Sequence, residues 1–366
     1  MTVWKNRDIL LPSYIPDHLV QRETEIQELS ENFEYITIPS TPYSYHIYGQ
    51  SGTGKTVVLR HLLKKLQQRT KAFIGYAIAE RTSALSAFSF LISVGRTGFS
   101  PHHSYVELWH AVESALNQRH ALIVLDEVDK LLSNPRLDLD FLYNLSRRDK
   151  TCLVTITNKP DVFDRLSHTS VGSSYRPVHY TFTPYNVTQL YQILDARVPH
   201  AFAVECPRDV IDRCAVTASG ETGDARYALD LLLYTGDVAQ KLKAKKLALE
   251  HFEQAKAELE SFDLNRQIDG LTRGQKAYLF AICLEAQSQR NPPITKVDER
   301  YRKIAQYFIV DSKITKYRLS QIRRELANIG IVGIFPVSKG RGKGVEWYIS
   351  LAEGYSPNKI QPLLEP

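Results

Sequence analysis

Residues 49–56 have the sequence GQSGTGKT, which fits the pattern G-x-x-x-x-G-K-[ST] at every position. The residues before it, 45–48, are typical of a short strand, and 57–66 repeat apolar side chains at the spacing of a helix. This order of strand, glycine-rich loop and helix distinguishes a phosphate-binding P-loop from a chance run of glycines. We therefore predict a nucleotide site here, with a plain glycine-rich turn as the alternative.

The chemistry of this loop suits the polyphosphate of a nucleotide. Glycine allows backbone N–H groups to turn inward around the β- and γ-phosphates, and the N-terminus of the next helix adds partial positive charge. Lys55 is expected to contact these phosphates, and the Thr56 hydroxyl to ligate Mg²⁺. We therefore expect ATP or ADP with Mg²⁺ as cofactors. The residues expected to hold them are Gly49, Gln50, Ser51, Gly52, Thr53, Gly54, Lys55, Thr56 and Val57.

A second motif, 121–127 (ALIVLDE), is a continuous apolar run that ends in two carboxylates. Such a run suits a central parallel strand that is buried on both faces, and its C-terminal end lies where these sheets bind ligands. We expect Asp126 to hold Mg²⁺, directly or through a water, and Glu127 to orient and deprotonate the attacking water. The alternative is a strand that ends on these residues by chance.

Two polar residues and one apolar segment are further candidates for the same site. Asn158 ends another apolar strand-like run and could reach the γ-phosphate or the lytic water, although Asn-Lys-Pro also favours a plain turn. Arg226 falls in the first turn of a predicted helix, where a cation is disfavoured unless an anion lies beside it. Upstream, Ile15, Leu19 and Val20 could form a wall of the base pocket or simply pack in the core.

Length and composition exclude several classes of protein. A chain of 366 residues should hold two or three domains, and 43% apolar residues is ordinary for a water-soluble globular protein. No apolar run approaches the roughly 20 residues that span a bilayer, and the N-terminus lacks the features of a signal peptide. Four scattered cysteines without a C-x-x-C pair argue against a zinc site or a disulfide framework. We expect a cytoplasmic protein without a membrane partner.

The net charge of +6 is unevenly distributed. Residues 270–351 contain 15 Lys/Arg and 6 Asp/Glu, a net charge of +9. The rest of the chain keeps 31 of the 46 basic and 34 of the 40 acidic residues, a net charge of −3. A local basic excess is typical of a nucleic-acid-binding module on a nearly neutral protein. A solvated basic face with no partner is the alternative.

The basic segment has the element order of a winged helix. The predicted helices are 274–287, 297–308 and 315–329, and the predicted strands are 331–335 and 345–349. The third helix would enter the major groove of double-stranded DNA, and the wing between the strands would reach phosphates or the minor groove. The expected contacts are Lys316, Arg318, Gln321, Arg323 and Arg324 on the third helix, with Arg341 and Lys343 on the wing. Docking of a protein is the alternative.

Together these motifs resemble those of the archaeal replication initiators, which are AAA+ ATPases related to the largest subunit of the origin recognition complex and to its helicase-loading partner. The resemblance covers about 8–351 and rests on GQSGTGKT, LIVLDEVDKL, TITNKP, FTPYN, GDARYALDLL and GRGKG. It makes Asn158 the sensor 1 residue and Arg226 the sensor 2 residue, which touches the γ-phosphate from the lid. The implied domains are an α/β AAA+ P-loop core at 8–184, an all-α lid at 185–265, a winged helix at 266–352 and a tail at 353–366.

The resemblance also implies a function. Members of the family bind origin duplex DNA through the winged helix and a helical insertion, here within 80–100, and help to recruit or load a replicative helicase of the MCM type. ATP binding with slow hydrolysis would act as a switch, and association with a second copy or a paralogue on DNA is expected. A AAA+ regulator of transposition or plasmid maintenance, and a signalling ATPase whose winged helix docks protein, remain the alternatives.

One position departs from the family pattern. An Asp-Pro-Arg-Val segment usually precedes the Ser-Ser pair, and Ser170 stands here where its arginine would be. Arg165 and Arg176 are nearby substitutes that could act in trans on a neighbour's nucleotide, unless neither does so. Hydrolysis is therefore expected to be impaired or altered.

Overall fold

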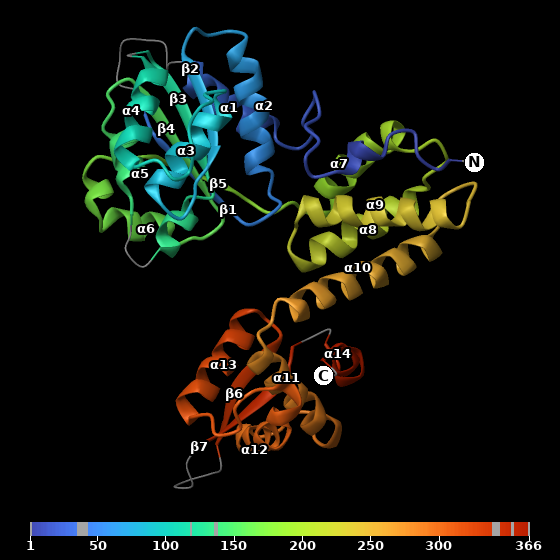
Figure 1. Ribbon diagram of the computed structural model, residues 1–366. Coiled ribbons are helices and arrows are strands. Elements are labelled where there is room, and N and C mark those ends of the chain that lie inside the picture. Colours follow the sequence, from blue (N-terminus) through green and yellow to red (C-terminus); the bar gives the residue numbers. More distant parts are fainter. Residues whose placement is uncertain are drawn as a thin grey trace. The chain divides into compact units, whose positions relative to one another are not determined.

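The computed structural model describes residues 2–34, 43–117, 119–134, 138–338, 345–352 and 355–364 (Figure 1). The chain forms two compact units, Met1–Lys256 and Ala257–Pro366, and the boundary between them lies inside helix α10 (Leu249–Asp269). Each unit has its own hydrophobic core, which is the property expected of an independent domain.

Unit 1 is built on a five-stranded parallel sheet with the order β2-β3-β4-β1-β5. The strands are β1 (Tyr45–Gly49), β2 (Phe73–Ile78), β3 (Ala121–Asp126), β4 (Thr151–Thr157) and β5 (Val178–Phe182). Every residue of β3 and β4 is buried, which confirms the prediction of a central strand from the apolar run. Because parallel strands end at the same edge, the loops after β1, β3 and β4 meet there.

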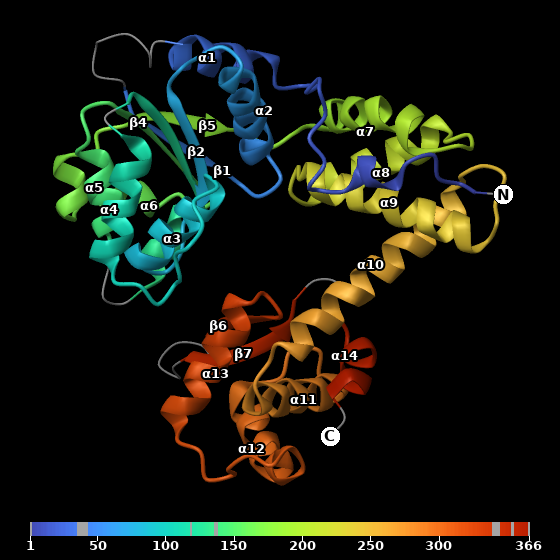
Figure 2. The same ribbon diagram turned by 45° about the horizontal axis from the view of Figure 1, so that its top comes forward.

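Helices cover both faces of this sheet (Figures 1 and 2). One face packs against α1 (Glu23–Glu34) and α2 (Lys55–Gln67), and the other packs against α3 (Ser83–Ser93), α4 (Tyr105–Leu116) and α5 (Asp140–Ser146). Successive side chains of β3 point to opposite faces of the sheet. Leu122 and Val124 belong to the core on the side of α1 and α2, and Ile123 and Leu125 to the core on the side of α3, α4 and α5. Shorter elements are η1 (Arg7–Leu10), η3 (Val128–Ser133), α6 (Val162–Ser167) and η4 (Ser170–Ser173).

The lid of unit 1 is helical, as expected. It contains α7 (Val187–Ala201), α8 (Arg208–Glu221), α9 (Ala225–Lys241) and the start of α10. Asn186 caps α7 and forms a capping box with Gln189. The first residues of the chain also pack on the lid, because the N–H groups of Lys5 and Asn6 donate to Ala201 O at 2.9 and 3.0 Å. Sequence periodicity gave no indication of this contact.

Unit 2 is a winged helix. Its helices α11 (Arg273–Ser288), α12 (Ile294–Ile304) and α13 (Lys316–Asn328) precede the antiparallel strands β6 (Val332–Ser338) and β7 (Val345–Leu351), which confirms the predicted order. The short helix η5 (Ala305–Phe308) follows α12. A further helix, α14 (Pro357–Leu364), lies in the segment expected to be a tail and buries Ile360 and Leu364 in the core of unit 2.

Two predictions remain, one about the wing residues and one about membrane-spanning segments. The wing residues Arg341 and Lys343 lie outside the described residues. In the part of the chain that the structure describes, no helix combines the length and the apolarity needed to cross a membrane.

Candidate nucleotide site and nucleic-acid interface

The P-loop lies between the end of β1 and the start of α2. Gly52 and Gly54 have φ values of 69° and 90°, which residues with a side chain rarely adopt. The lid also requires these glycines, because a Cβ atom at Gly52 would lie 1.5 Å from Asp224 Oδ1 and one at Gly54 would lie 2.5 Å from the Tyr185 hydroxyl. The glycine pattern therefore serves the close approach of the lid as well as the backbone turn.

Lys55 is nearly buried in the first turn of α2, with 8% of the residue exposed. Its Nζ atom donates to the carbonyl oxygens of Gly49 and Gln50 at 2.6 and 2.7 Å. Burial lowers the pKa of Lys55 to about 8, while the carboxylate of Asp126 raises it and the nearby Arg226 lowers it further. The ammonium group thus lies inside the loop, between the acidic end of β3 and the lid.

At the C-terminal end of β3, the carboxylate of Asp126 accepts three hydrogen bonds from the described residues. Thr56 Oγ1 donates to Asp126 Oδ2 at 2.7 Å, and the Tyr76 hydroxyl donates to the same oxygen at 2.8 Å. The N–H of Glu127 donates to Asp126 Oδ1 at 2.9 Å. The structure thus brings together Thr56 and Asp126, the two residues expected to hold magnesium. Tyr76 is a residue of this cluster that sequence reasoning missed.

Glu127 leaves β3 in the left-handed region, with a φ of 58°, and the chain then turns into η3. Its carboxylate forms an ion pair with Lys130, with 2.7 Å between Oε2 and Nζ. Nearby, Asp129 pairs with Lys159 at 3.2 Å and accepts a hydrogen bond from Thr157. The end of β3 is therefore surrounded by paired charges, and Glu127 is one of them.

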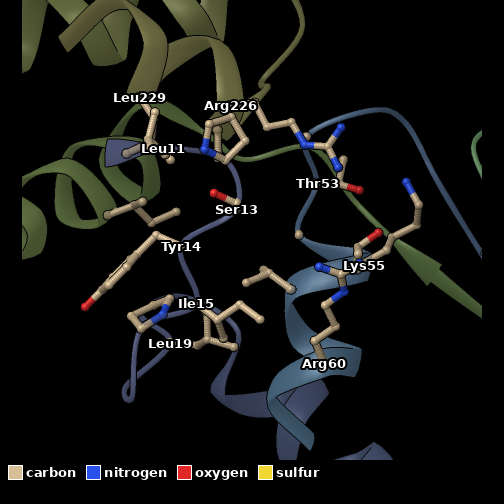
Figure 3. A pocket seen from close by; sticks show the side chains of 18 of the residues that line it. Leu11, Ser13, Tyr14, Ile15, Leu19, Thr53, Lys55, Arg60, Arg226 and Leu229 are labelled. Atoms are coloured by element: carbon tan, nitrogen blue, oxygen red, sulfur yellow. The ribbon is translucent and has the colours of Figure 1, made fainter. Parts of the chain in front are cut away.

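A cavity of unit 1 gathers most of the residues predicted to bind nucleotide (Figure 3). From the P-loop and strand ends its lining includes Ser51, Gly52, Thr53, Gly54, Lys55, Thr56, Val57, Asp126, Glu127 and Asn158, and from the other elements it includes Ile15, Val20 and Arg226. Gly49 and Gln50 are not part of this lining, and their carbonyl oxygens accept hydrogen bonds from Lys55 Nζ.

The lid contributes lining residues that the sequence did not indicate. These are Ile193, Ala196, Arg197 and His200 on α7, together with Leu229 on α9. Figure 3 shows Leu11, Tyr14 and Ile15 of the N-terminal segment around the same cavity as Leu229 and Arg226. Apolar and aromatic side chains of this kind suit the flat face of a base.

Hydrogen bonds fix the start of α9 against the P-loop. The N–H of Ala225 donates to Gly52 O at 3.1 Å, and Asp224 caps the helix by accepting from the N–H of Arg226 at 2.7 Å. Arg226 therefore lies in the first turn of α9, in the lining of the cavity that also contains the P-loop. A neighbouring anion site would explain a cation in this turn.

The outer face of α13 carries most of the predicted nucleic-acid contacts. Lys316, Arg318 and Arg324 are exposed, and Gln321 is half-buried. Arg318 Nη1 donates to Gln321 Oε1 at 2.9 Å, so these two side chains are ordered together. Tyr317, which the sequence reasoning passed over, is 70% exposed on the same helix.

Arg323 does not face outward, so the expectation that it is available to DNA is wrong. Its Nη1 atom lies 2.7 Å from Asp298 Oδ1 and 3.1 Å from the Tyr278 hydroxyl, and only 13% of its side chain is exposed. The reason is its place one helical turn after the buried Leu319, on the flank of α13 next to α11 and α12.

The segment around Ser170, where the family usually has an arginine, forms a short helix. Ser170 begins the short helix η4. Arg165 Nη2 donates to Leu132 O at 2.9 Å and lies near Asp161, while Arg176 is exposed. An action of either arginine in trans stays a prediction.

Comparison with known proteins agrees with this arrangement. Three family models match the chain: an AAA domain at 38–166, a Cdc6 AAA+ ATPase-type lid domain at 191–257 and a CDC6 C-terminal winged helix domain at 266–356. An ORC1-type DNA replication protein of Methanothermobacter thermautotrophicus is 34% identical over 358 residues, which cover 97% of this chain and 95% of the relative. ORC1-type DNA replication protein 1 of Sulfurisphaera tokodaii is 32% identical, covering 96% and 91%.

A solved structure gives the same result. The Aeropyrum pernix ORC1 protein in complex with DNA matches with a TM-score of 0.84 and 31% identity, covering 99% of this chain and 96% of that chain. The P-loop, the helical lid and the winged helix described above all fall within this match. The chain therefore belongs to the family of ORC1-type DNA replication proteins, AAA+ ATPases with a Cdc6-type lid and a C-terminal winged helix.

Proposed function

We propose that this chain is an ATP-dependent initiator of DNA replication that binds origin duplex DNA and helps to recruit or load the replicative helicase. One observation carries the proposal: the same chain has two parts with different roles. One is a P-loop cavity that includes Arg226 of the lid, and the other is a winged helix in a basic segment. ATP would act as the switch, and the DNA-binding surfaces would give the output.

The cavity supports binding of ATP with Mg²⁺. Lys55 would hold the β- and γ-phosphates. Thr56 and Asp126 would hold the ion through oxygen atoms, and Thr56 Oγ1 already lies 2.7 Å from Asp126 Oδ2. When bound, the ion would neutralise phosphate charge. Asn158 and Arg226 would contact the γ-phosphate from the sheet and from the lid, and the segment with Ile15 and Val20 would cover the base.

The surroundings of Glu127 support slow hydrolysis. As the general base, its carboxylate would accept a proton from the attacking water. In the structure Oε2 of this carboxylate lies 2.7 Å from Lys130 Nζ, so the proton would go to Oε1 or the ion pair would open first. A slow ATPase suits a switch that holds one state for a long time.

The winged helix supports duplex DNA as the partner. Lys316, Arg318 and Gln321 on α13 would reach the major groove, and Arg341 and Lys343 on the wing would contact phosphates. Binding of DNA by the Aeropyrum pernix relative adds to this support. The helical insertion within 80–100, which contains α3, is proposed as a second DNA contact, and nucleoid association would follow from DNA binding.

Protein partners are proposed from membership of the family. They are an MCM-type helicase and a second copy or paralogue of the chain on DNA. In such an assembly, Arg165 or Arg176 would supply the arginine in trans that Ser170 replaces.

The direct test is footprinting on origin sequences of the source organism, together with affinities for origin and random duplexes of equal length at one salt concentration. We expect protection within the origin and at least about tenfold preference for it. Equal affinity for both duplexes would exclude sequence-specific initiation and favour the non-specific regulator of transposition or plasmid maintenance. No binding of either duplex would favour the protein-docking signalling ATPase.

Matched variants separate the two activities. Arg318→Ala should weaken DNA binding about tenfold and reduce the salt slope by about one, with nucleotide affinity unchanged. Arg341→Ala or Lys343→Ala should act in the same way. Lys55→Ala should have the reverse effects: it should weaken nucleotide binding and leave the DNA affinity measured without nucleotide unchanged. Arg323→Ala is the contrast: it should lower the melting temperature, because it leaves the mostly buried Asp298 without its cation. Loss of both activities in both Arg318→Ala and Lys55→Ala would contradict this division.

A further inference from the structure

Arg22 lies at a junction of unit 1 that neither the motifs nor the cavity lining includes. It directly precedes α1 and is 3% exposed, although it carries a positive charge. The N-terminal segment that lines the cavity ends just before it. A buried cation of this kind needs an explanation, because desolvation of its charge is costly unless its hydrogen bonds are satisfied.

The guanidinium of Arg22 joins two distant parts of the backbone. Its Nη2 atom donates to Thr53 O in the P-loop at 2.9 Å and to Thr183 O, after β5, at 2.7 Å. Its Nη1 atom pairs with Glu25 on α1. The Nε atom is buried without a hydrogen-bond partner among the described residues. The guanidinium thus connects the P-loop, the segment after β5 and α1 at one point.

The same guanidinium also stacks on the connector that leads from β5 to the lid. It lies 4.0 Å from the ring centroid of Tyr185 and 5.3 Å from that of Phe182. The Tyr185 hydroxyl in turn lies against Gly54, where a Cβ atom would be 2.5 Å away. Arg22 and Tyr185 therefore hold the connector and the P-loop together as a packed pair.

This pair continues into the lid. The N–H of Tyr185 donates to Gly223 O at 3.1 Å, and two residues later the N–H of Ala225 donates to Gly52 O at 3.1 Å. The path from Arg22 through Tyr185 thus reaches the first turn of α9, which carries Arg226. A displacement of the connector would move Arg226 relative to the P-loop.

We propose that Arg22 is a positioning residue that locks the lid connector to the P-loop and thereby sets nucleotide affinity without touching the nucleotide. The inference rests on the proposed nucleotide site. The planar guanidinium is required because it donates to two carbonyls while stacking on Tyr185, and a lysine would keep the charge without the flat, forked group.

The test compares Arg22→Lys with Arg148→Lys. Arg148 is a matched control, because it is half-buried in the same unit and its Nη1 atom donates to Arg119 O and to Thr151 Oγ1, at the N-terminal end of β4. The measurements are the dissociation constants of fluorescent ATP and ADP analogues, the melting temperature without nucleotide, and amide exchange at Tyr185. We expect at least about tenfold weaker binding and faster exchange at Tyr185 for Arg22→Lys, with less than about twofold change for Arg148→Lys.

A second pair of variants keeps the test independent of general stability. Tyr185→Phe keeps the ring under the guanidinium but loses the hydroxyl that lies against Gly54, so it should weaken nucleotide binding less than Tyr185→Leu does. The double variant Arg22→Lys/Tyr185→Leu should lose less binding free energy than the sum of the two single losses, since both substitutions remove the stacking contact between the two side chains. Two results would overturn the role of Arg22. One is wild-type nucleotide affinity in Arg22→Lys. The other is a loss of nucleotide affinity that follows the fall in melting temperature equally in Arg22→Lys and Arg148→Lys. Failure of the wild-type chain itself to bind ATP would overturn the nucleotide site.

Discussion

Burial controls the protonation of Lys55, the cation at the centre of the P-loop. Its pKa is lowered to about 8, whereas a lysine in an unfolded chain has a pKa of about 10.4. Between these two values the unfolded chain binds more protons than the folded chain, so the stability contribution of Lys55 becomes more favourable as pH rises. Below the lower value both states are protonated, and the full cost of burying the charge is present.

The same titration predicts a pH dependence of nucleotide binding. Above pH about 8 the free protein loses the proton of Lys55, so affinity for ATP should fall, by up to about tenfold per pH unit. A titration with a fluorescent ATP analogue from about pH 7.5 to about pH 9.5 measures this, in a range where the terminal phosphate of ATP is already ionised. Lys55→Arg is the control, because its guanidinium does not titrate there. An equally steep decline in that variant would show that another group is responsible.

The hydrogen bond from Tyr76 to Asp126 leads to a prediction about the rate of ATP hydrolysis. Its hydroxyl donates to Asp126 Oδ2, so Tyr76→Phe removes a bond that orients an expected magnesium ligand. We expect the rate of ATP hydrolysis at saturating ATP to fall about tenfold, with nucleotide affinity changed less than about twofold. Tyr105→Phe is the control, because it removes a hydrogen bond that Asn144 Nδ2 donates to the Tyr105 hydroxyl, away from the cavity. Equal turnover in the two variants would contradict a role for Tyr76.

At the scale of elements, the N-terminal segment is part of the lid. Trp4 stacks on Phe202 with ring centroids 4.7 Å apart, and Arg7 donates two hydrogen bonds to Asp237 on α9. The chain then continues from η1 into the segment that lines the cavity. The packing of the lid and the shape of the cavity are therefore linked through one stretch of backbone.

Gly236 on α9 tests this packing. A Cβ atom there would lie 2.3 Å from Trp4 Cη2, so Gly236→Ala should displace the indole and destabilise unit 1 by about 1–3 kcal/mol. Gly220→Ala in α8 has open space and should be neutral or stabilising by up to about 1 kcal/mol. Chemical denaturation followed by tryptophan fluorescence compares the two. Equal effects of both substitutions would show that Trp4 does not pack tightly on α9.

At the scale of the whole molecule, the two units should respond differently to nucleotide. The cavity lies entirely in unit 1, while unit 2 has its own core around Tyr278 and Tyr301. ATP should therefore slow amide exchange in α2, α9 and the N-terminal segment, and leave the core of α11 unchanged in the absence of DNA. Hydrogen-exchange mass spectrometry measures both. Lys55→Ala should show no protection, and equal protection of α11 in the wild type would contradict the prediction.

The sequence by itself determined the residues whose role depends on local backbone geometry. A strand, a glycine-rich turn and a helix place Lys55 and Thr56 in register whatever surrounds them, and an apolar strand carries Asp126 and Glu127 to the sheet edge. The winged-helix order followed from short-range periodicity for the same reason. Such motifs bring their own geometry with them, so one sequence was enough to predict the P-loop and the winged helix, while the resemblance to the replication initiators implied the AAA+ core and the lid.

Only the tertiary structure decided the contacts between distant segments. Tyr76 is 50 residues from Asp126, and Arg22 is 161 residues from Thr183, so their pairing depends on how strands and lid pack. The same holds for α14, and for Arg323, which turns from the DNA side to Asp298. The physical reason is that side-chain partners across a fold are selected by packing and by the need to satisfy buried charge, and neither leaves a local pattern in the chain.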